Sequence, residues 1–261
     1  MSTYPDLVSE YIEYVNYKSK FGQNSKIDLS DMKFVYPTTL LPLSEIILKN
    51  KDKYVPPKLY KVENYISTIL ESTSSNFKHT YTPIVALPES CEEVDEALKK
   101  IFEMQRSTSD FGGISAFKYV VSELVDNIYQ HSRFTRALIM GQRYDTLGFI
   151  DLSFYDNGIT IPQTFKEKGL NHEASFAIRE ALNGVSTKDN DRGFGLRTSL
   201  NLFTHGLNSE FFVVSGNGAV HCDKKGDKLY RLTESGGLKG TLISVRIPKN
   251  TPEVDIYDYV E

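Results

Sequence analysis

The chain has 261 residues, of which 40% are hydrophobic, 25% charged and 12% aromatic, so it can form a packed core and does not have the composition of a disordered protein. Its formal net charge of -4 argues against a nucleic-acid partner, because binding to a phosphate backbone relies on a basic surface. Two cysteines are too few for a disulfide framework, and the N-terminus has no basic region followed by an apolar run, so we expect a cytoplasmic protein without membrane spans.

The first 78 residues are predicted to form a small α/β domain. Residues 25–36 have the β-branched and aromatic character of a strand, and the Pro-Thr-Thr sequence that follows is typical of a helix start. A second strand–helix unit is expected after Pro57. The sequence "STSSNFKHTYTP" (72–83) is rich in Ser and Thr and has little periodicity, so we place the domain boundary there.

Residues 79–250 are predicted to form a larger α/β domain that begins with two helices, the second running from about Gly113 to Ser132. Strands are expected at 136–144, 148–156, 209–216, 227–234 and 240–248. A helical stretch (162–187) and a glycine-rich loop that opens another helix lie between the second and third of these strands. The sequence "SGNGAVH" is interpreted as a hairpin turn, and residues 251–261 as a loose acidic tail.

The sequence "SELVDNIYQHS" (122–132) carries three polar side chains at intervals of four residues, namely Glu123, Asn127 and His131. Because this interval is close to one helical turn, the three side chains lie along one stripe of the predicted helix. One interpretation is a binding site. The alternative is a helix whose polar face meets solvent while its apolar face enters the core.

Three further motifs follow in chain order. "YDNGITIP" (155–162) closes a predicted strand, "DRGFGL" (191–196) precedes a predicted helix, and Gly240 with Thr241 opens the last strand. Taken singly, each has an ordinary structural explanation, namely an Asn-Gly turn, a glycine-rich helix start and a strand threonine. The common phosphate-loop, nucleophile-elbow and HExxH signatures do not occur in the sequence.

In this order, the four motifs resemble the nucleotide-binding motifs of the GHKL superfamily, which includes gyrase, heat-shock chaperones, histidine kinases, MutL and the anti-sigma-factor serine kinases. "ELVDN" is similar to the gyrase and MutL helix, and the trailing "HS" to the histidine and serine kinases. The resemblance covers residues 90–248. It implies a Bergerat-type α/β sandwich, with helices on one face of a mixed, mainly antiparallel sheet, that binds ATP with magnesium.

The resemblance also implies roles for the matched residues. Asn127 would supply an oxygen ligand to Mg²⁺, and Glu123 would act as the general base for attack on the γ-phosphate. Asp156 would accept a hydrogen bond from the exocyclic amine of adenine, Gly158 would let the backbone approach the ring, and Thr241 would lie near the adenine-binding carboxylate.

The glycine-rich motif would bind phosphates, because free backbone N–H groups and the positive end of a helix dipole meet there. Residues 162–192 would form a lid over the nucleotide. The other nucleotide-contacting residues that the resemblance implies are His131, Ile161, Lys188, Arg192, Gly193, Phe194, Gly195 and Leu196. His131 has an alternative role as a C-terminal helix cap. Thr160 departs from the family, which has a second glycine at this position.

The first unit resembles the STAS-like fold of anti-anti-sigma factors, in which a strand leads into a phosphorylatable Ser or Thr at a helix N-terminus. Thr38 and Thr39 occupy that position, although Pro37 and Leu40 replace the usual acidic residue and glycine. Helix capping by Thr38 is therefore the simpler interpretation.

Together these features predict a signalling protein that transfers the γ-phosphoryl group of ATP to a Ser or Thr of a partner protein. A hydrolytic ATPase of the gyrase or MutL type is the first alternative, with "ELVDN" as its best support, and a non-catalytic ATP sensor is the second. The expected protein partner is a STAS-like or other regulator, and a homodimer is a further candidate.

Overall fold

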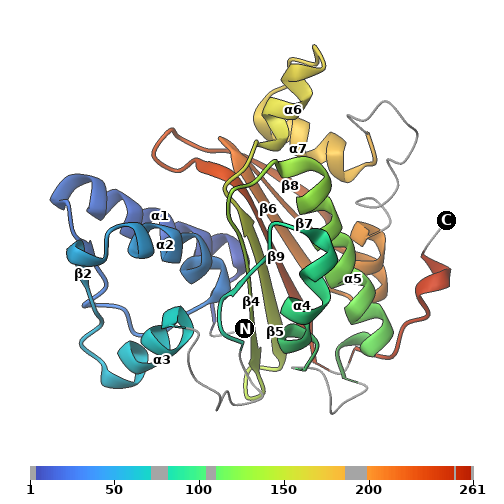
Figure 1. The fold of residues 1–261 in the computed structure, drawn as a ribbon. Helices are drawn as coiled ribbons and strands as arrows, with labels where there is room; N and C mark the ends of the chain where they lie inside the picture. The colour runs from blue at the N-terminus through green and yellow to red at the C-terminus, as the bar shows by residue number, and fades with distance from the viewer. Residues whose placement is uncertain (1–3, 72–81, 104–109, 186–198, 250, 260–261) are drawn as a thin grey trace.

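The computed structural model describes residues 4–71, 82–103, 110–185, 199–249 and 251–259, and in this part of the chain a seven-stranded sheet carries helices on both faces (Figure 1). Its strands are β3 (Val85–Ala86), β4 (Ala137–Tyr144), β5 (Phe149–Asp156), β6 (Glu210–Gly216), β7 (Gly218–Asp223), β8 (Gly226–Arg231) and β9 (Leu238–Pro248). Their spatial order is β3-β4-β5-β9-β6-β7-β8, and each neighbouring pair is antiparallel. The long final strand β9 therefore lies at the centre, between β5 and β6.

One face of the sheet is covered by helices that follow residue 90 in the chain. These are α4 (Val94–Glu103), α5 (Ile114–Asn127) and α7 (Ala174–Leu182), while the shorter α6 (Ile161–Glu167) lies at one end of the sheet (Figure 1). The apolar stripe of α5 contacts alternate residues of β5, such as Leu152 and Phe154, in one shared core. Short 3-10 helices lie at Cys91–Glu93, Asp110–Gly112 and Ile256–Asp258, and π-helical turns at Ile128–Ser132, which continues α5, and at Leu202–Gly206, which follows the helical residues 199–201.

The opposite face is covered by the N-terminal residues (Figure 1). They form α1 (Leu7–Asn24), β1 (Ile27–Asp28), α2 (Pro37–Lys49), the turn Lys51–Lys53, β2 (Tyr54–Val55) and α3 (Tyr60–Glu71). Strands β1 and β2 pair in parallel, apart from the main sheet. Helix α1 buries three tyrosines of one helical face, Tyr11, Tyr14 and Tyr17, in a core that also contains residues of β4, β5, β6, β7 and β9. The N-terminal helices and the sheet therefore share one hydrophobic core.

The face of the sheet beneath α1 carries polar residues as well as apolar ones. All eight residues of β5 are buried, and its alternation places Asp151 and Ser153 on this second face. The register pairs them with Arg246 and Ser244 of β9. The hydroxyls of Ser153 and Ser244 lie 2.9 Å apart in a hydrogen bond. A polar stripe thus crosses the two central strands under the N-terminal helices.

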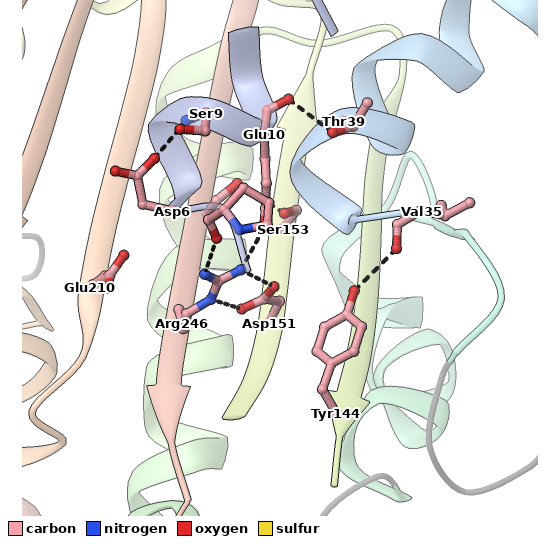
Figure 2. A network of polar contacts seen from close by, with 12 residues as sticks. Asp6, Ser9, Glu10, Val35, Thr39, Tyr144, Asp151, Ser153, Glu210 and Arg246 are labelled. Carbon is pink, nitrogen blue, oxygen red and sulfur yellow. Dashed lines mark hydrogen bonds and ion pairs between the residues drawn. The ribbon is translucent and has the colours of Figure 1, made fainter. Parts of the chain in front are cut away.

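The guanidinium of Arg246 connects this stripe to the N-terminus (Figure 2). It donates two hydrogen bonds of 2.8 Å to the carboxylate of Asp151 and one of 2.7 Å to the carbonyl oxygen of Pro5. It also donates to the carboxyl group of Glu10 on α1, and it lies 4.0 Å from the ring centroid of Phe149. The side chains of Glu10 and Asp151 are fully buried, and that of Arg246 is 5% exposed.

One cation in this network faces two acidic groups. Burial, and second the repulsion of Asp151, raise the pKa of Glu10 well above its usual range. Burial raises the pKa of Asp151 to about 6, against the opposing effect of Arg246. We therefore assign the proton to Glu10 and the negative charge to Asp151 at neutral pH, which leaves Arg246 and Asp151 as a buried, bidentate ion pair.

The structure confirms the predicted helix between Gly113 and Ser132 and all five strands predicted after residue 135. It corrects several expectations. The predicted strand over 25–36 is limited to β1, because the segment that follows runs across the face of the sheet into α2 without a strand partner. The hairpin at "SGNGAVH" is present, but its second arm is a further strand, β7. The expectation that helices cover only one face of the sheet is incomplete, because α1 and α2 cover the second face.

The segment expected as a loose tail is bound to the body of the protein. Thr251 is buried and its hydroxyl donates to the carbonyl oxygen of Pro248, 2.7 Å away. The backbone of Gly112 bonds to both Thr251 and Val254 at 3.0 Å. Tyr259 packs against the core beneath α5 and α7. These contacts make the tail part of the fold.

The helix start at Pro37 also differs from the expectation. Tyr36 occupies the capping position without a side-chain hydrogen bond, so the interpretation of Thr38 as a cap is wrong. Thr38 and Thr39 are both buried, and the hydroxyl of Thr39 donates to the backbone carbonyl of Glu10 at 2.8 Å. In this arrangement neither hydroxyl is open to phosphorylation. In the part of the chain that the structure covers, no helix combines the length and apolar character needed to cross a bilayer.

Replacing Arg246 by Met should lower the free energy of unfolding by about 3–5 kcal/mol, because Asp151 is left as an unpaired buried charge. Glu10→Gln should cost less than about 1 kcal/mol at pH 7, since Gln resembles the protonated carboxyl that burial favours. Urea unfolding of both variants measures this difference. Lys20→Met, which breaks an exposed ion pair with Asp31, is the control. A larger loss for Glu10→Gln than for Arg246→Met would contradict the proton assignment.

Candidate functional site

The candidate site is centred on Asp156, the last residue of β5, whose side chain is almost entirely buried. Its Oδ1 accepts a hydrogen bond of 2.9 Å from the backbone N–H of Gly158. Asn157, between them, bonds to the start of β4: its Oδ1 accepts from the backbone N–H groups of Thr135 (3.1 Å) and Arg136 (2.9 Å), and its own N–H donates to the carbonyl of Arg136 (3.1 Å). The Asn-Gly turn is therefore held by the carboxylate of Asp156 and by the backbone just before β4.

The turn lies directly against the C-terminal end of the α5 segment. A β-carbon placed on Gly158 would be 1.9 Å from the carbonyl oxygen of Ser132, so only glycine fits here without a shift of the backbone. The same carbonyl accepts the N–H of Ile159 at 2.6 Å. The helix that carries the polar stripe thus ends against the Asp156 turn.

The third part of the site is the beginning of β9. Gly240 has a φ of +87°, and a β-carbon on it would lie 1.9 Å from the carbonyl oxygen of Asp156. Thr241 is the register partner of Asp156 on one side and of Ser215 on the other. The hydroxyls of Thr241 and Ser215 are 2.9 Å apart, and Ser215 Oγ accepts the backbone N–H of Ile161 at 2.9 Å. Four segments distant in sequence therefore meet at Asp156.

Thr160, the departure from the family motif, has a local structural explanation. Its hydroxyl caps the N-terminus of α6 by accepting the N–H of Gln163 at 3.3 Å. A glycine there would lose this cap. The start of α6 is fixed instead by the cap and by the bond from Ile161 to Ser215.

The three stripe residues all lie at the margin of the buried face of the α5 segment. Glu123, Asn127 and His131 are each partly buried. Asn127 Nδ2 donates to the backbone carbonyl of Glu123 at 2.8 Å, which leaves Oδ1 as the atom that could bind a cation. Burial, and then the nearby Asp126, raise the pKa of Glu123, and a raised pKa makes a carboxylate a stronger base near neutral pH.

Two buried polar groups at the site have fewer hydrogen-bond partners than buried groups usually have. Burial raises the pKa of Asp156 to about 7, only partly opposed by the Gly158 N–H. The hydroxyl of Ser132 is buried and has no hydrogen-bond partner among the described residues. Buried polar groups are usually satisfied, and each exception needs an explanation, of which a bound ligand is one.

The remaining predicted residues lie outside the described part of the chain. These are Lys188, Arg192, Gly193, Phe194, Gly195 and Leu196. Of the expected lid, α7 is packed into the core through Ile178 and Leu182, so this helix is part of the layer that covers the sheet.

Sequence reasoning missed Ser132, Ser215 and the role of Arg136. The strand motif before Ser215 is visible in the sequence, but its position opposite Thr241 depends on the register of β6 and β9, which no local pattern encodes. The contact of Gly158 with Ser132 depends in the same way on how α5 is placed over the sheet.

The described residues also contain two surface grooves, beside the site. One, of about 540 Å³, includes Thr160 and Gly216, and the other, of about 620 Å³, includes Arg231 and Thr233. Neither is lined by the polar stripe or by Asp156. Within the described ranges, no three His, Cys, Asp or Glu side chains gather as they would around a metal ion. Any cation here would therefore depend on Asn127, waters and a ligand's own oxygens.

Comparisons with known proteins add no assignment. No protein-family model matches the chain, and neither curated proteins nor solved structures give a match. The functional argument therefore depends on the geometry of the site and on the motifs themselves.

Asp156→Asn should stabilise the protein at pH 8 and have no such effect below pH 4. Because the pKa of Asp156 is raised from 3.8 to about 7 on folding, the buried carboxyl is tolerated below pH 4, and its cost to stability grows as the pH rises from about 4 to the folded pKa of about 7. The expected gain at pH 8 is about 1–3 kcal/mol, measured by urea unfolding at both pH values. Asp52→Asn, at an exposed position, is the control. A loss of stability at pH 8 would refute the pKa argument.

Gly158→Ala and Gly240→Ala should each destabilise the protein by about 2–4 kcal/mol, because the new methyl group meets a carbonyl oxygen. Gly22→Ala, in α1, has open space around it and should be neutral or stabilising. Thermal unfolding of the three variants tests the packing of the site. Equal melting temperatures would show that the three segments do not approach so closely.

Proposed function

We propose that the chain is a GHKL-type protein that binds ATP with Mg²⁺ and transfers the γ-phosphoryl group to a Ser or Thr of a partner protein. The observation that carries the proposal is the convergence on Asp156 of the end of the α5 segment, the Asn-Gly turn and the Gly240–Thr241 strand start. These are three of the four motifs that resemble the GHKL nucleotide site. The sheet with α4, α5 and α7 on one face is compatible with a Bergerat-type sandwich.

Asp156 is the proposed adenine-binding residue. An ordinary Asn-Gly turn needs no buried carboxyl group, because an exposed Asp or Asn can accept the same backbone hydrogen bond. Here the carboxyl is buried with one backbone donor, at a cost that its raised pKa reflects. The exocyclic amine of adenine would supply a further donor and favour the ionised form. Ser132, with its unpartnered hydroxyl, and Thr241 would complete the polar lining.

Asn127 is the proposed Mg²⁺ ligand, and Glu123 the proposed general base. The metal, when bound, would neutralise charge on the phosphate oxygens. Glu123, whose pKa is raised by burial, would accept the proton of the attacking hydroxyl or water. Phosphate binding is assigned, from the sequence alone, to Gly193 and Gly195 together with Lys188 and Arg192.

Two other functions use the same site. A hydrolytic ATPase is favoured by the sequence "ELVDN" and by the same base, with water in place of the partner's hydroxyl. A nucleotide sensor would bind ATP and leave it intact. Of the partner itself, the proposal requires only a reachable Ser or Thr.

Calorimetry with ATP and with ADP, each with and without Mg²⁺, tests binding. Asp156→Asn should weaken ATP binding by about tenfold to a hundredfold, as expected for the loss of a buried charged acceptor. Asn127→Ala should remove the Mg²⁺ dependence, whereas Glu123→Gln should bind ATP normally. Absence of ATP binding by the wild-type chain, or normal binding by Asp156→Asn, would overturn the proposed site.

The fate of γ-labelled ATP then separates the three functions. Label on protein supports the kinase, and release of labelled phosphate supports the ATPase. If neither product forms, the sensor is supported. Glu123→Gln should lose either reaction by at least about a hundredfold while it retains binding. Glu92→Gln, an exposed Glu outside the proposed site, is the matched control.

A further inference from the structure

We propose that the N-terminal helices hold the two backbone segments of the nucleotide site from the opposite face of the sheet, so that Glu45 and Tyr11 are positioning residues for nucleotide binding. The inference rests on the function proposed above and adds a regulatory input to it. Helices α1 and α2 lie on the face opposite α5, so these residues are separated from the polar stripe by the sheet (Figure 1).

The first contact reaches the Asn-Gly turn from α2. Glu45 is buried, with its Oε2 3.3 Å from Arg136 Nε and its Oε1 2.5 Å from Lys49 Nζ. Arg136 is the residue whose backbone N–H and carbonyl both bond to Asn157. The carboxylate of α2 therefore holds the side chain of the residue whose peptide groups fix the turn after Asp156.

The second contact reaches the start of β9 from α1. Tyr11 Oη donates to the carbonyl of Gly236 at 2.9 Å, and Lys18 Nζ to that of Gly237 at 2.5 Å. Tyr155, which packs in the same core as α1, donates through its hydroxyl to the carbonyl of Lys239 at 3.3 Å. Two of the carbonyl groups just before Gly240 are thus bound by α1, and the third is bound by a β5 residue that packs in the same core as α1.

Both segments contact the backbone next to Asp156. Gly240 leaves no room for a side chain beside the carbonyl oxygen of Asp156, so we expect a displacement of the 236–239 segment to move the backbone beside Asp156. A displacement of Arg136 would also move Asn157, because the backbone N–H and carbonyl of Arg136 both bond to Asn157. Any partner that shifts α1 or α2 would therefore change nucleotide affinity, and by thermodynamic linkage nucleotide would change the seating of the helices.

The test is the affinity of the full chain for a non-hydrolysable ATP analogue, measured by calorimetry. Tyr11→Phe and Glu45→Gln should each weaken binding by about fivefold, which is at the low end of typical coupling between sites. Arg136→Lys, which keeps a cation for Glu45, should bind nearly as the wild type does, whereas Arg136→Leu should weaken binding like Glu45→Gln. Lys20→Gln, which breaks an α1 ion pair remote from both segments, should leave the affinity unchanged.

Hydrogen exchange of the wild-type chain gives an independent readout that needs no variant. Saturation with the analogue should slow exchange of the backbone amides of α1 and α2. If Tyr11→Phe and Glu45→Gln bind as the wild type does, or if the helices show no change in exchange, the coupling is refuted while the nucleotide site stands. If the wild-type chain binds no nucleotide, both proposals fall.

Discussion

The fold depends on one buried guanidinium. Arg246, in the central strand β9, bonds to Asp151 on the neighbouring strand, to Glu10 on α1 and to the backbone of Pro5 (Figure 2). A buried cation is tolerated only when its donors are satisfied, so the N-terminal segment has to lie where it does. This constraint fixes α1 over the sheet and buries the polar residues of that face together with its apolar ones. The specificity of the contact matters more than its net energy, because buried ion pairs contribute little over apolar packing.

With α1 and α2 packed on it, the sheet has a hydrophobic core on each face. The candidate site lies at the end of β5, beside Asp156. The apolar core beneath α5 places the end of that helix against the Asp156 turn. The second core places Tyr11 and Glu45 behind the backbone segments that close the site. Asp156 therefore sits where contacts from both layers meet. Its unfavourable burial is stable because the glycines at 158 and 240 allow backbone to pack around it on two sides.

Local patterns predicted much of the second half of the chain. The helix with its polar stripe and the strands ending at Asp156 and Pro248 follow from periodicity. The contact of the Gly158 backbone with Ser132 was not predicted, since the close approach expected at Gly158 was to a bound adenine ring. The first half was predicted less well. Its buried tyrosines on α1 have helical spacing, but the segment between β1 and α2 has strand-like composition and no strand partner. Strand propensity reflects a side chain's fit to a pleated surface, and that segment packs against one without joining it.

The sequence by itself determined the helix over 113–132, the strands β4, β5, β6, β8 and β9, the stripe of Glu123, Asn127 and His131, and the carboxylate at the end of β5, because helix and strand periods and turn chemistry are local properties. Only the tertiary structure decided that Asp151 and Arg246 form a buried pair, that Ser215 faces Thr241, and that Tyr11 of α1 bonds to the backbone of Gly236. A strand with alternating polar residues has the same sequence pattern whether its second face is exposed to water or covered by another layer of the protein. Burial and register arise from long-range packing, and no local sequence pattern encodes them.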